Sequence, residues 1–104
     1  MANWQMKIDF SPAKVKYRSG EITINELSKV VVAALKTNVK KAMWIDAEMG
    51  QELEDDIIPL FEEVADFDTC DVEDFDNALE NLYDWADTPL DDRFGGKKMC
   101  WIAP

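Results

Sequence analysis

The sequence contains no histidine, so it lacks the residue that most often serves as a general base and as a nitrogen ligand for metals. It has no GxGxxG or P-loop pattern, and its three serines have no GxSxG context. Paired carboxylates are so frequent that they single out no acid–base pair. We therefore expect a protein that is not an enzyme, with no catalytic residues and no cofactor.

Cysteines and long apolar runs are equally scarce. Cys70 and Cys100 are isolated and lack metal-ligand spacing, which indicates free thiols rather than a disulfide. The longest apolar run, Val30 to Leu35, is far too short to cross a bilayer, and the N-terminus lacks the pattern of a signal peptide. These absences predict a soluble chain in the cytoplasm.

Basic residues are absent from the segment between Asp46 and Asp92, which contains nineteen Asp and Glu residues. Residues 1–41 carry eight basic and three acidic groups, a net charge of +5, whereas residues 42–104 carry three basic and nineteen acidic groups, a net charge of −16. Hydrophobic residues make up 47% of the chain, so the acidic segment is predicted to fold rather than to form a disordered tail.

The length of 104 residues predicts a single domain, residues 1–104. Its parts are a basic N-terminal third at 1–41, an acidic helical region at 46–92 and a closing strand at 98–102. Apolar residues alternate over Trp4–Phe10, which predicts a strand that pairs with the closing strand. The predicted fold class is α+β, with about three helices packed on a small two-stranded antiparallel sheet formed by the N- and C-terminal segments.

The basic third is expected to contain two helices. Ser11-Pro12 favours a short helix stopped near Gly20, with a second strand over residues 12–18 as the alternative. Thr23 and Glu26 form a capping box, which predicts the start of a long helix that ends near Asn38. Lysines at 29, 36 and 40 lie roughly opposite its apolar face and suit a phosphate or, equally, the acidic rows of a second copy in a homodimer.

Two further helices carry the acidic residues. The first is expected from about Asp46 to Asp66, with Pro59 kinking it or splitting it into two collinear pieces. Asp71 is expected to cap the last helix. Its predicted core stripe is Val72, Phe75, Leu79, Leu82 and Ala86, with Trp85 at the margin of the apolar face.

Acidic residues recur on these helices at the spacing of one helix face. Two such rows on helices packed about 8–10 Å apart carry about one charge per 2.7 Å, close to the roughly 3.4 Å per charge of one DNA strand. An aromatic ring among acids is also a common hot-spot arrangement for a basic partner. The residues predicted to contact a partner are Glu48, Glu52, Asp55, Glu62, Asp66, Glu73, Asp76, Glu80, Asp84, Trp85 and Asp87.

The acids around residue 70 resemble the ligands of a calcium-binding loop in type but not in spacing. An EF-hand loop started at Asp66 puts Cys70 and Asn77 at ligand positions and Asp71 where the turn needs glycine. The pattern therefore fails at the residues that shape the loop. No metal ligands are predicted.

In size and folded acidity the chain resembles the small nucleic-acid-mimic inhibitors of phages and mobile elements, of the anti-restriction and anti-CRISPR type. The residues that carry this resemblance are the acidic rows Glu48–Asp66 and Glu73–Asp87. The resemblance implies a non-enzymatic inhibitor that occupies the basic groove of a nucleic-acid-binding enzyme, in the host cytoplasm if a phage encodes it. The dense negative charge repels nucleic acid and anionic membranes, so we expect neither to bind directly. The alternative is an interaction or assembly module of a phage or bacterium, whose acidity serves solubility or self-association. A metal-dependent hydrolase that uses paired carboxylates is the least favoured class.

Overall fold

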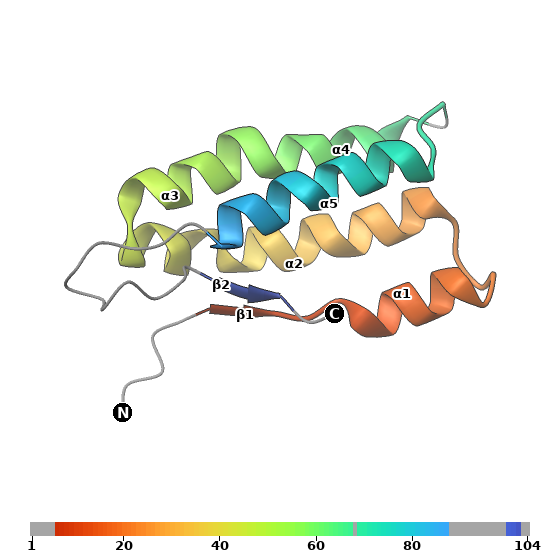
Figure 1. Cartoon of the computed structure of the whole chain (residues 1–104), viewed down its shortest axis with the longest axis horizontal. Coiled ribbons are helices and arrows are strands. Elements are labelled where there is room, and N and C mark those ends of the chain that lie inside the picture. The colour runs from red at the N-terminus through yellow and green to blue at the C-terminus, as the bar shows by residue number, and fades with distance from the viewer. Residues whose placement is uncertain (1–5, 68, 88–99, 103–104) are drawn as a thin grey trace.

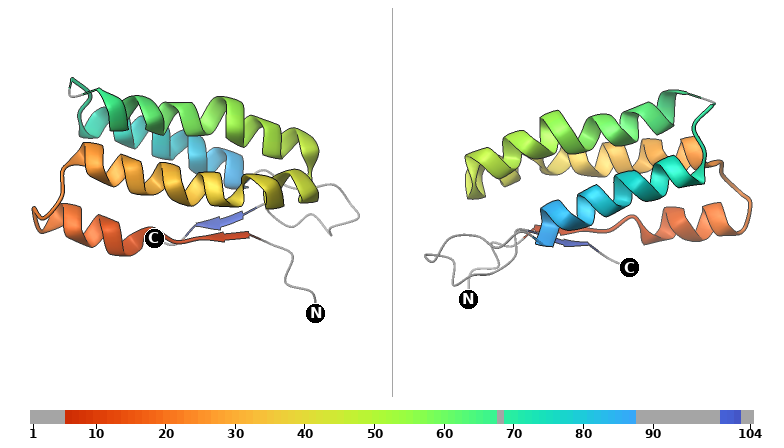
Figure 2. Two further views of the ribbon diagram at one scale, coloured as in Figure 1. Left: turned by 180° about the vertical axis from the view of Figure 1, so that it is seen from behind. Right: turned by 45° about the horizontal axis from the view of Figure 1, so that its top comes forward.

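The computed structural model describes residues 6–67, 69–87 and 100–102. Their elements are β1 (Met6–Ile8), α1 (Ser11–Arg18), α2 (Ile24–Ile45), α3 (Ala47–Glu52), a π-helical turn (Leu53–Ile57), α4 (Ile58–Asp66), α5 (Val72–Asp87) and β2 (Cys100–Ile102). The helix formed by α3, the π turn and α4 is continuous. It runs side by side with α2 and α5, while α1 lies along the edge of α2 (Figure 1 and Figure 2).

The predicted α+β fold class is wrong, because the described chain is mostly helical. Its only sheet in the described part is a pair of three-residue strands, with partners Met6–Cys100, Lys7–Trp101 and Ile8–Ile102. These strands run parallel, not antiparallel as predicted. Apart from Ile8 and Phe10, the buried core comes from helices. The outer parts of both predicted strands, including Trp4 and residues 98–99, lie outside the described residues.

The helix predicted after Ser11-Pro12 is confirmed as α1, and the alternative strand is excluded. Ser11 is its first residue. Asp9 accepts hydrogen bonds from the Ser11 backbone N–H at 2.9 Å and from Ser11 Oγ at 2.6 Å. These bonds stabilise the carboxylate and lower the pKa of Asp9. The chain turns after the helix at Gly20, whose φ of +85° is a conformation that glycine adopts without strain.

The capping box at the start of α2 is confirmed. Thr23 Oγ1 accepts from the Glu26 N–H at 3.1 Å, and the Glu26 carboxylate accepts from the Thr23 N–H at 3.2 Å. The predicted end near Asn38 is wrong, because α2 continues to Ile45. Asn38 does not break the helix, since its side chain donates to the Ala34 carbonyl one turn earlier at 2.7 Å. The apolar face also continues beyond it, with Ala42 and Ile45 buried.

Asp46 alone joins α2 to α3. Its extended backbone, with φ −154° and ψ 113°, ends α2, and its carboxylate accepts from the N–H groups of Glu48 and Met49 to cap α3. The predicted helix start at about Asp46 is thereby confirmed. α3 then folds back so closely on α2 that Gly50 is buried against the backbone of Met43. This tight turn sets the direction of the helix formed by α3, the π turn and α4.

A π-helical turn lies directly before Pro59, the residue expected to kink or split the helix. The Ile58 N–H donates to the Leu53 carbonyl, five residues earlier, which widens the helix just before the proline. Pro59 then occupies the first turn of α4, and it is exposed. α3, the π turn and α4 therefore form one continuous helix, with the extra residue of the π turn just before the proline.

The cap predicted for the last helix is also confirmed. Asp71 Oδ1 accepts from the Glu73 and Asp74 N–H groups, and Asp74 accepts from the Asp71 N–H at 3.0 Å. Phe75 packs edge to face against Phe61 of α4, with ring centroids 5.6 Å apart. The buried face is rotated from the predicted stripe, however: Val72 is 46% exposed, whereas Ala78 and Trp85 are buried.

Ser28 on α2 is a polar residue buried in the core. Its side chain is fully buried, and its hydroxyl has no hydrogen-bond partner among the described residues. A buried unpaired polar group costs about 1–3 kcal/mol. We expect Ser28→Ala to raise the free energy of unfolding by about 1 kcal/mol, because alanine removes the unpaired oxygen and is the better helix former. Urea denaturation measures the change, and a loss of stability in this variant contradicts the assignment.

Candidate functional site: an acidic helical surface

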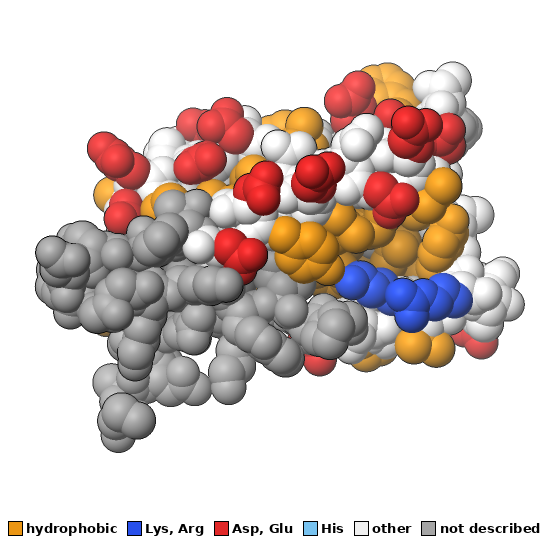
Figure 3. Space-filling model, in the orientation of Figure 1, with side chains coloured by type: hydrophobic (Ala, Val, Ile, Leu, Met, Phe, Trp, Pro, Cys, Tyr) orange, Lys and Arg blue, Asp and Glu red, His pale blue; other side chains and the backbone are white. Residues whose placement is uncertain are grey.

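The acidic side chains of α3, α4 and α5 lie at the surface. Figure 3 shows them spread over these helices and separated from the basic side chains below by a hydrophobic band. Among the described acids from residue 46 to residue 87, only Asp46 and Glu62 are half-buried, and all others are exposed. The partner-binding residues that the sequence predicted and that are exposed are Glu48, Glu52, Asp55, Asp66, Glu73, Asp76, Glu80, Asp84 and Asp87.

The row on α5 is the most coherent part of this surface. Glu73, Glu80 and Asp84 are separated by seven and four residues, so they share one side of the helix. The helix buries its opposite side, through Phe75 and Leu82, against the rest of the core. This places a line of carboxylates where α5 projects farthest from the core.

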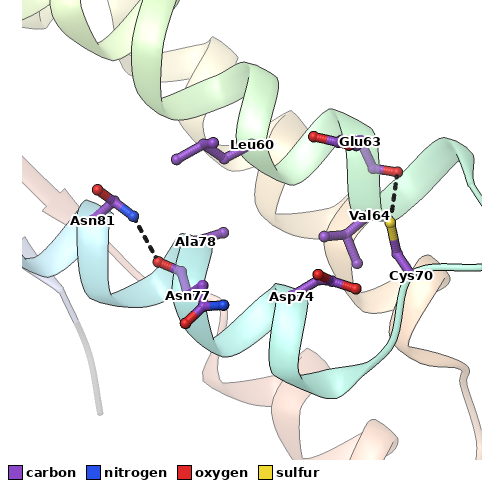
Figure 4. Close-up of a pocket in the computed structure, with 8 residues that line it drawn as sticks. All are labelled: Leu60, Glu63, Val64, Cys70, Asp74, Asn77, Ala78 and Asn81. Carbon is purple, nitrogen blue, oxygen red and sulfur yellow. Dashed lines mark hydrogen bonds between the residues drawn. The ribbon is translucent and has the colours of Figure 1, made fainter.

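A groove between α4 and α5 adds acids that the sequence prediction missed. Its volume is about 160 Å³, and it is lined by Leu60, Glu63, Val64, Cys70, Asp74, Asn77, Ala78 and Asn81 (Figure 4). Glu63 comes from one helix and Asp74 from the start of the other, with the apolar Leu60 and Ala78 between the two helices. Asn77 and Asn81 extend the polar border along α5, with the Asn81 amide donating to the Asn77 carbonyl at 2.8 Å.

Cys70, a free cysteine, lies at the end of this groove. Partial burial raises its pKa, and the charges of Asp74, Glu63 and Asp71 raise it further. Its Sγ lies 3.7 Å from the Glu63 carbonyl, as the dashed line in Figure 4 marks. Because the thiolate is the reactive form, this environment opposes nucleophilic chemistry.

The two predicted acidic rows do not form one continuous wall. Asp55 and Glu62 border a groove between α2 and α4 that also contains Lys36 and Lys40. Lys36 Nζ lies 3.4 Å from Glu62 Oε2. Glu48, Glu52 and Asp55 stay together on α3 and the π turn, where they border a shallow hollow.

Two other predicted contact residues also lie away from the α5 row. Asp76 borders a groove between α5 and α1, together with Lys14 and Arg18. Trp85 is 2% exposed, and its indole Nε1 donates to the Met49 carbonyl at 2.9 Å. The prediction that Trp85 lies at the edge of the acidic surface is therefore wrong. Its ring is a core anchor that joins α5 to α3.

The acidic surface is suited to electrostatic binding. Within the part of the chain that the structure describes, no three Asp, Glu or Cys side chains are grouped so that they could hold a metal ion. No helix in that part is both long and apolar enough to span a membrane. What the surface presents is a set of outward carboxylates that can pair with lysine or arginine side chains.

Comparison with protein-family models, curated proteins and solved structures finds no match to this chain.

Proposed function

We propose that this protein is a non-enzymatic binding protein whose α5 row and α4–α5 groove engage a basic surface on another protein. The observation that carries the proposal is the exposed line of carboxylates on α5. Glu73 and Glu80 form no ion pair within the described part of the chain, so their charges are available to a partner. Glu63 and Asp74 add negative charge beside this line.

Repulsion between the like charges on this surface destabilises the free protein, and binding to a basic partner relieves it. Like charges one helical turn apart destabilise a helix by about 0.2–0.5 kcal/mol per pair. A partner rich in lysine and arginine removes that repulsion and gains speed and specificity of association from the complementary charges. Basic protein surfaces of this kind hold the phosphates of DNA or RNA. The proposed partner is therefore a nucleic-acid-binding protein or complex, and the acidic surface acts as a nucleic-acid mimic.

We also propose a biological role as an inhibitor. The compositional resemblance favours an inhibitor of phage or mobile-element origin, of the anti-restriction or anti-CRISPR type. The cytoplasm is the compartment in which such an inhibitor meets its target. Neither direct nucleic-acid binding nor membrane binding is part of the proposal, since the net charge of −11 repels both phosphate backbones and anionic lipids.

Capture from bacterial lysate at graded salt tests the function. The immobilised protein is expected to retain nucleic-acid-binding proteins at low ionic strength and to release them as screening rises. Glu73→Lys together with Glu80→Lys is expected to weaken binding of a captured partner about 30-fold, or about 2 kcal/mol, because two attractions become repulsions. Isothermal titration with that partner measures the change.

A matched control changes the net charge equally at another place. Glu21→Lys with Glu54→Lys alters two exposed acids outside the α5 row and the α4–α5 groove. We expect this control to retain most of the affinity. Equal losses in the two variants, or retained partners that are indifferent to salt, contradict the proposed function.

A second candidate function, as an assembly module, is favoured by a separate observation. α2, which lies behind α5 in Figure 1, carries exposed lysines, so one molecule presents both signs of charge.

A further inference from the structure

The outer face of α2 is a basic surface that the acidic site does not use. Lys29, Lys36 and Lys40 are exposed there, with the small exposed Ala33 between the first two. Trp44 follows one turn after Lys40 and is 79% exposed. An exposed tryptophan beside lysines is unusual on a surface that serves only solubility, since Trp is a favoured interface anchor.

The basic face is the side of α2 opposite to the buried Val31 and Leu35, and the α5 row is the side of α5 opposite to the buried Phe75 and Leu82. Both surfaces therefore point away from the core, on helices that lie on opposite sides of the molecule. Figure 1 shows α5 in front, and the view from behind in Figure 2 shows α2 in front of it. The two surfaces therefore cannot neutralise each other within one chain. Among the described residues, the one ion pair that involves this face joins Lys36 to Glu62, and both side chains are half exposed, at 58% and 42%. A pair this exposed is weak and can exchange for another.

The spacing of charges on the two helices is the same. Lys29, Lys36 and Lys40 are separated by seven and four residues, and so are Glu73, Glu80 and Asp84. At 1.5 Å per residue, both sets place their charges about 10.5 and 6 Å apart along the helix axis. With the two helices aligned in the same direction, each lysine meets an acid. Ala33 then meets Asn77, where two small or short side chains allow a close approach.

We propose that the basic face of α2 is a docking surface for the α5 row of a second copy of this chain. Trp44, beyond the last lysine, adds apolar contact area at the end of this interface. Since the two surfaces differ and lie on opposite sides, the contact is head to tail and leaves a free surface on each end of a pair. Copies therefore add to one another in an open series rather than closing as a two-fold dimer.

Analytical ultracentrifugation tests the docking. At low ionic strength we expect the average mass of the wild-type protein to rise with concentration. It should return to that of a monomer as ionic strength rises from about 0.01 M to about 1 M, over which the screening length falls from about 30 to about 3 Å. Lys29→Glu with Lys40→Glu and, separately, Glu73→Lys with Glu80→Lys are each expected to remain monomeric at every concentration.

Mixing the two variants distinguishes this contact from non-specific association. The first variant keeps an intact acidic row and the second keeps an intact basic face, so together they form one good interface. We expect the mixture to form one-to-one pairs that grow no further. A wild-type protein that stays monomeric throughout, or variants that do not associate when mixed, overturns the proposal. Trp44→Ala is expected to weaken wild-type association about tenfold, and an unchanged affinity removes Trp44 from the interface.

The same variants separate this inference from the proposed function. Docking uses the α5 row that the proposed function assigns to a basic partner, so self-association and partner binding compete. Lys29→Glu with Lys40→Glu abolishes only docking, and we expect this variant to bind the captured partner at least as tightly as the wild type. Partner binding without self-association in the wild type defeats the docking alone. Self-association without any captured partner defeats the proposed function alone.

Discussion

Gly50→Ala is expected to lower the free energy of unfolding by about 3 kcal/mol, because no space exists for a methyl group where α3 folds back on α2. A Cβ at this position would lie 2.6 Å from Met43 Cα. The obstacle is backbone, so a change of rotamer cannot relieve it. The melting temperature should fall by about 15 °C. Thermal and urea denaturation followed by far-UV circular dichroism measures both quantities.

Gly20→Ala provides the control for this change. Gly20 has a positive φ of +85°, but nothing lies within reach of an added Cβ. The expected loss of about 1–2 kcal/mol reflects backbone conformation alone. If Gly50→Ala costs no more than Gly20→Ala, the close contact of α2 and α3 is not as tight as the structure indicates.

Trp85→Ala is expected to have the largest effect of any substitution on α5. The ring is 2% exposed, and its removal leaves a cavity between α5 and α3, which typically costs about 3–5 kcal/mol. The Met49 carbonyl also loses the indole N–H that donates to it at 2.9 Å. Equilibrium denaturation in urea measures the loss. The buried position further predicts that partner binding is unaffected in any Trp85 variant that still folds.

Trp85→Phe separates the two contributions. Phenylalanine keeps most of the buried ring but cannot donate a hydrogen bond, so the expected loss is about 1–3 kcal/mol. In the folded state of this variant, fluorescence quenching by iodide should increase, since Trp44 is exposed and a buried emitter has been removed. A Trp85→Phe variant as unstable as Trp85→Ala shows that the hydrogen bond, not the packing, anchors the helix.

Features determined by a few neighbouring residues were predictable from the sequence. The caps at Thr23 and Asp71 and the stop near Gly20 are confirmed, because each depends on hydrogen bonds or backbone angles within one turn. The exposure of Pro59 was likewise predictable from the phase of the apolar residues around it.

Features that depend on contacts between residues far apart in the sequence could not be predicted from the sequence. A period of two identifies a strand but not its direction, and the orientation of β1 and β2 depends on the path of the helices between them. The apolar arc of α5 is broad enough to bury either Val72 or Trp85, and only packing against α3 decides between them. The acids of the α4–α5 groove, Glu63 and Asp74, face each other only after two helices are brought together.

The separation of charge described above also gives the molecule a large electric dipole moment. Positive groups are concentrated on α1 and α2, and negative groups on α3, α4 and α5, within one folded body. In the field of a strongly basic target, a dipole rotates during approach, so the acidic helices turn toward the target before any contact forms. Encounters are then productive from more starting orientations, and their rate falls steeply as salt shortens the range of the field.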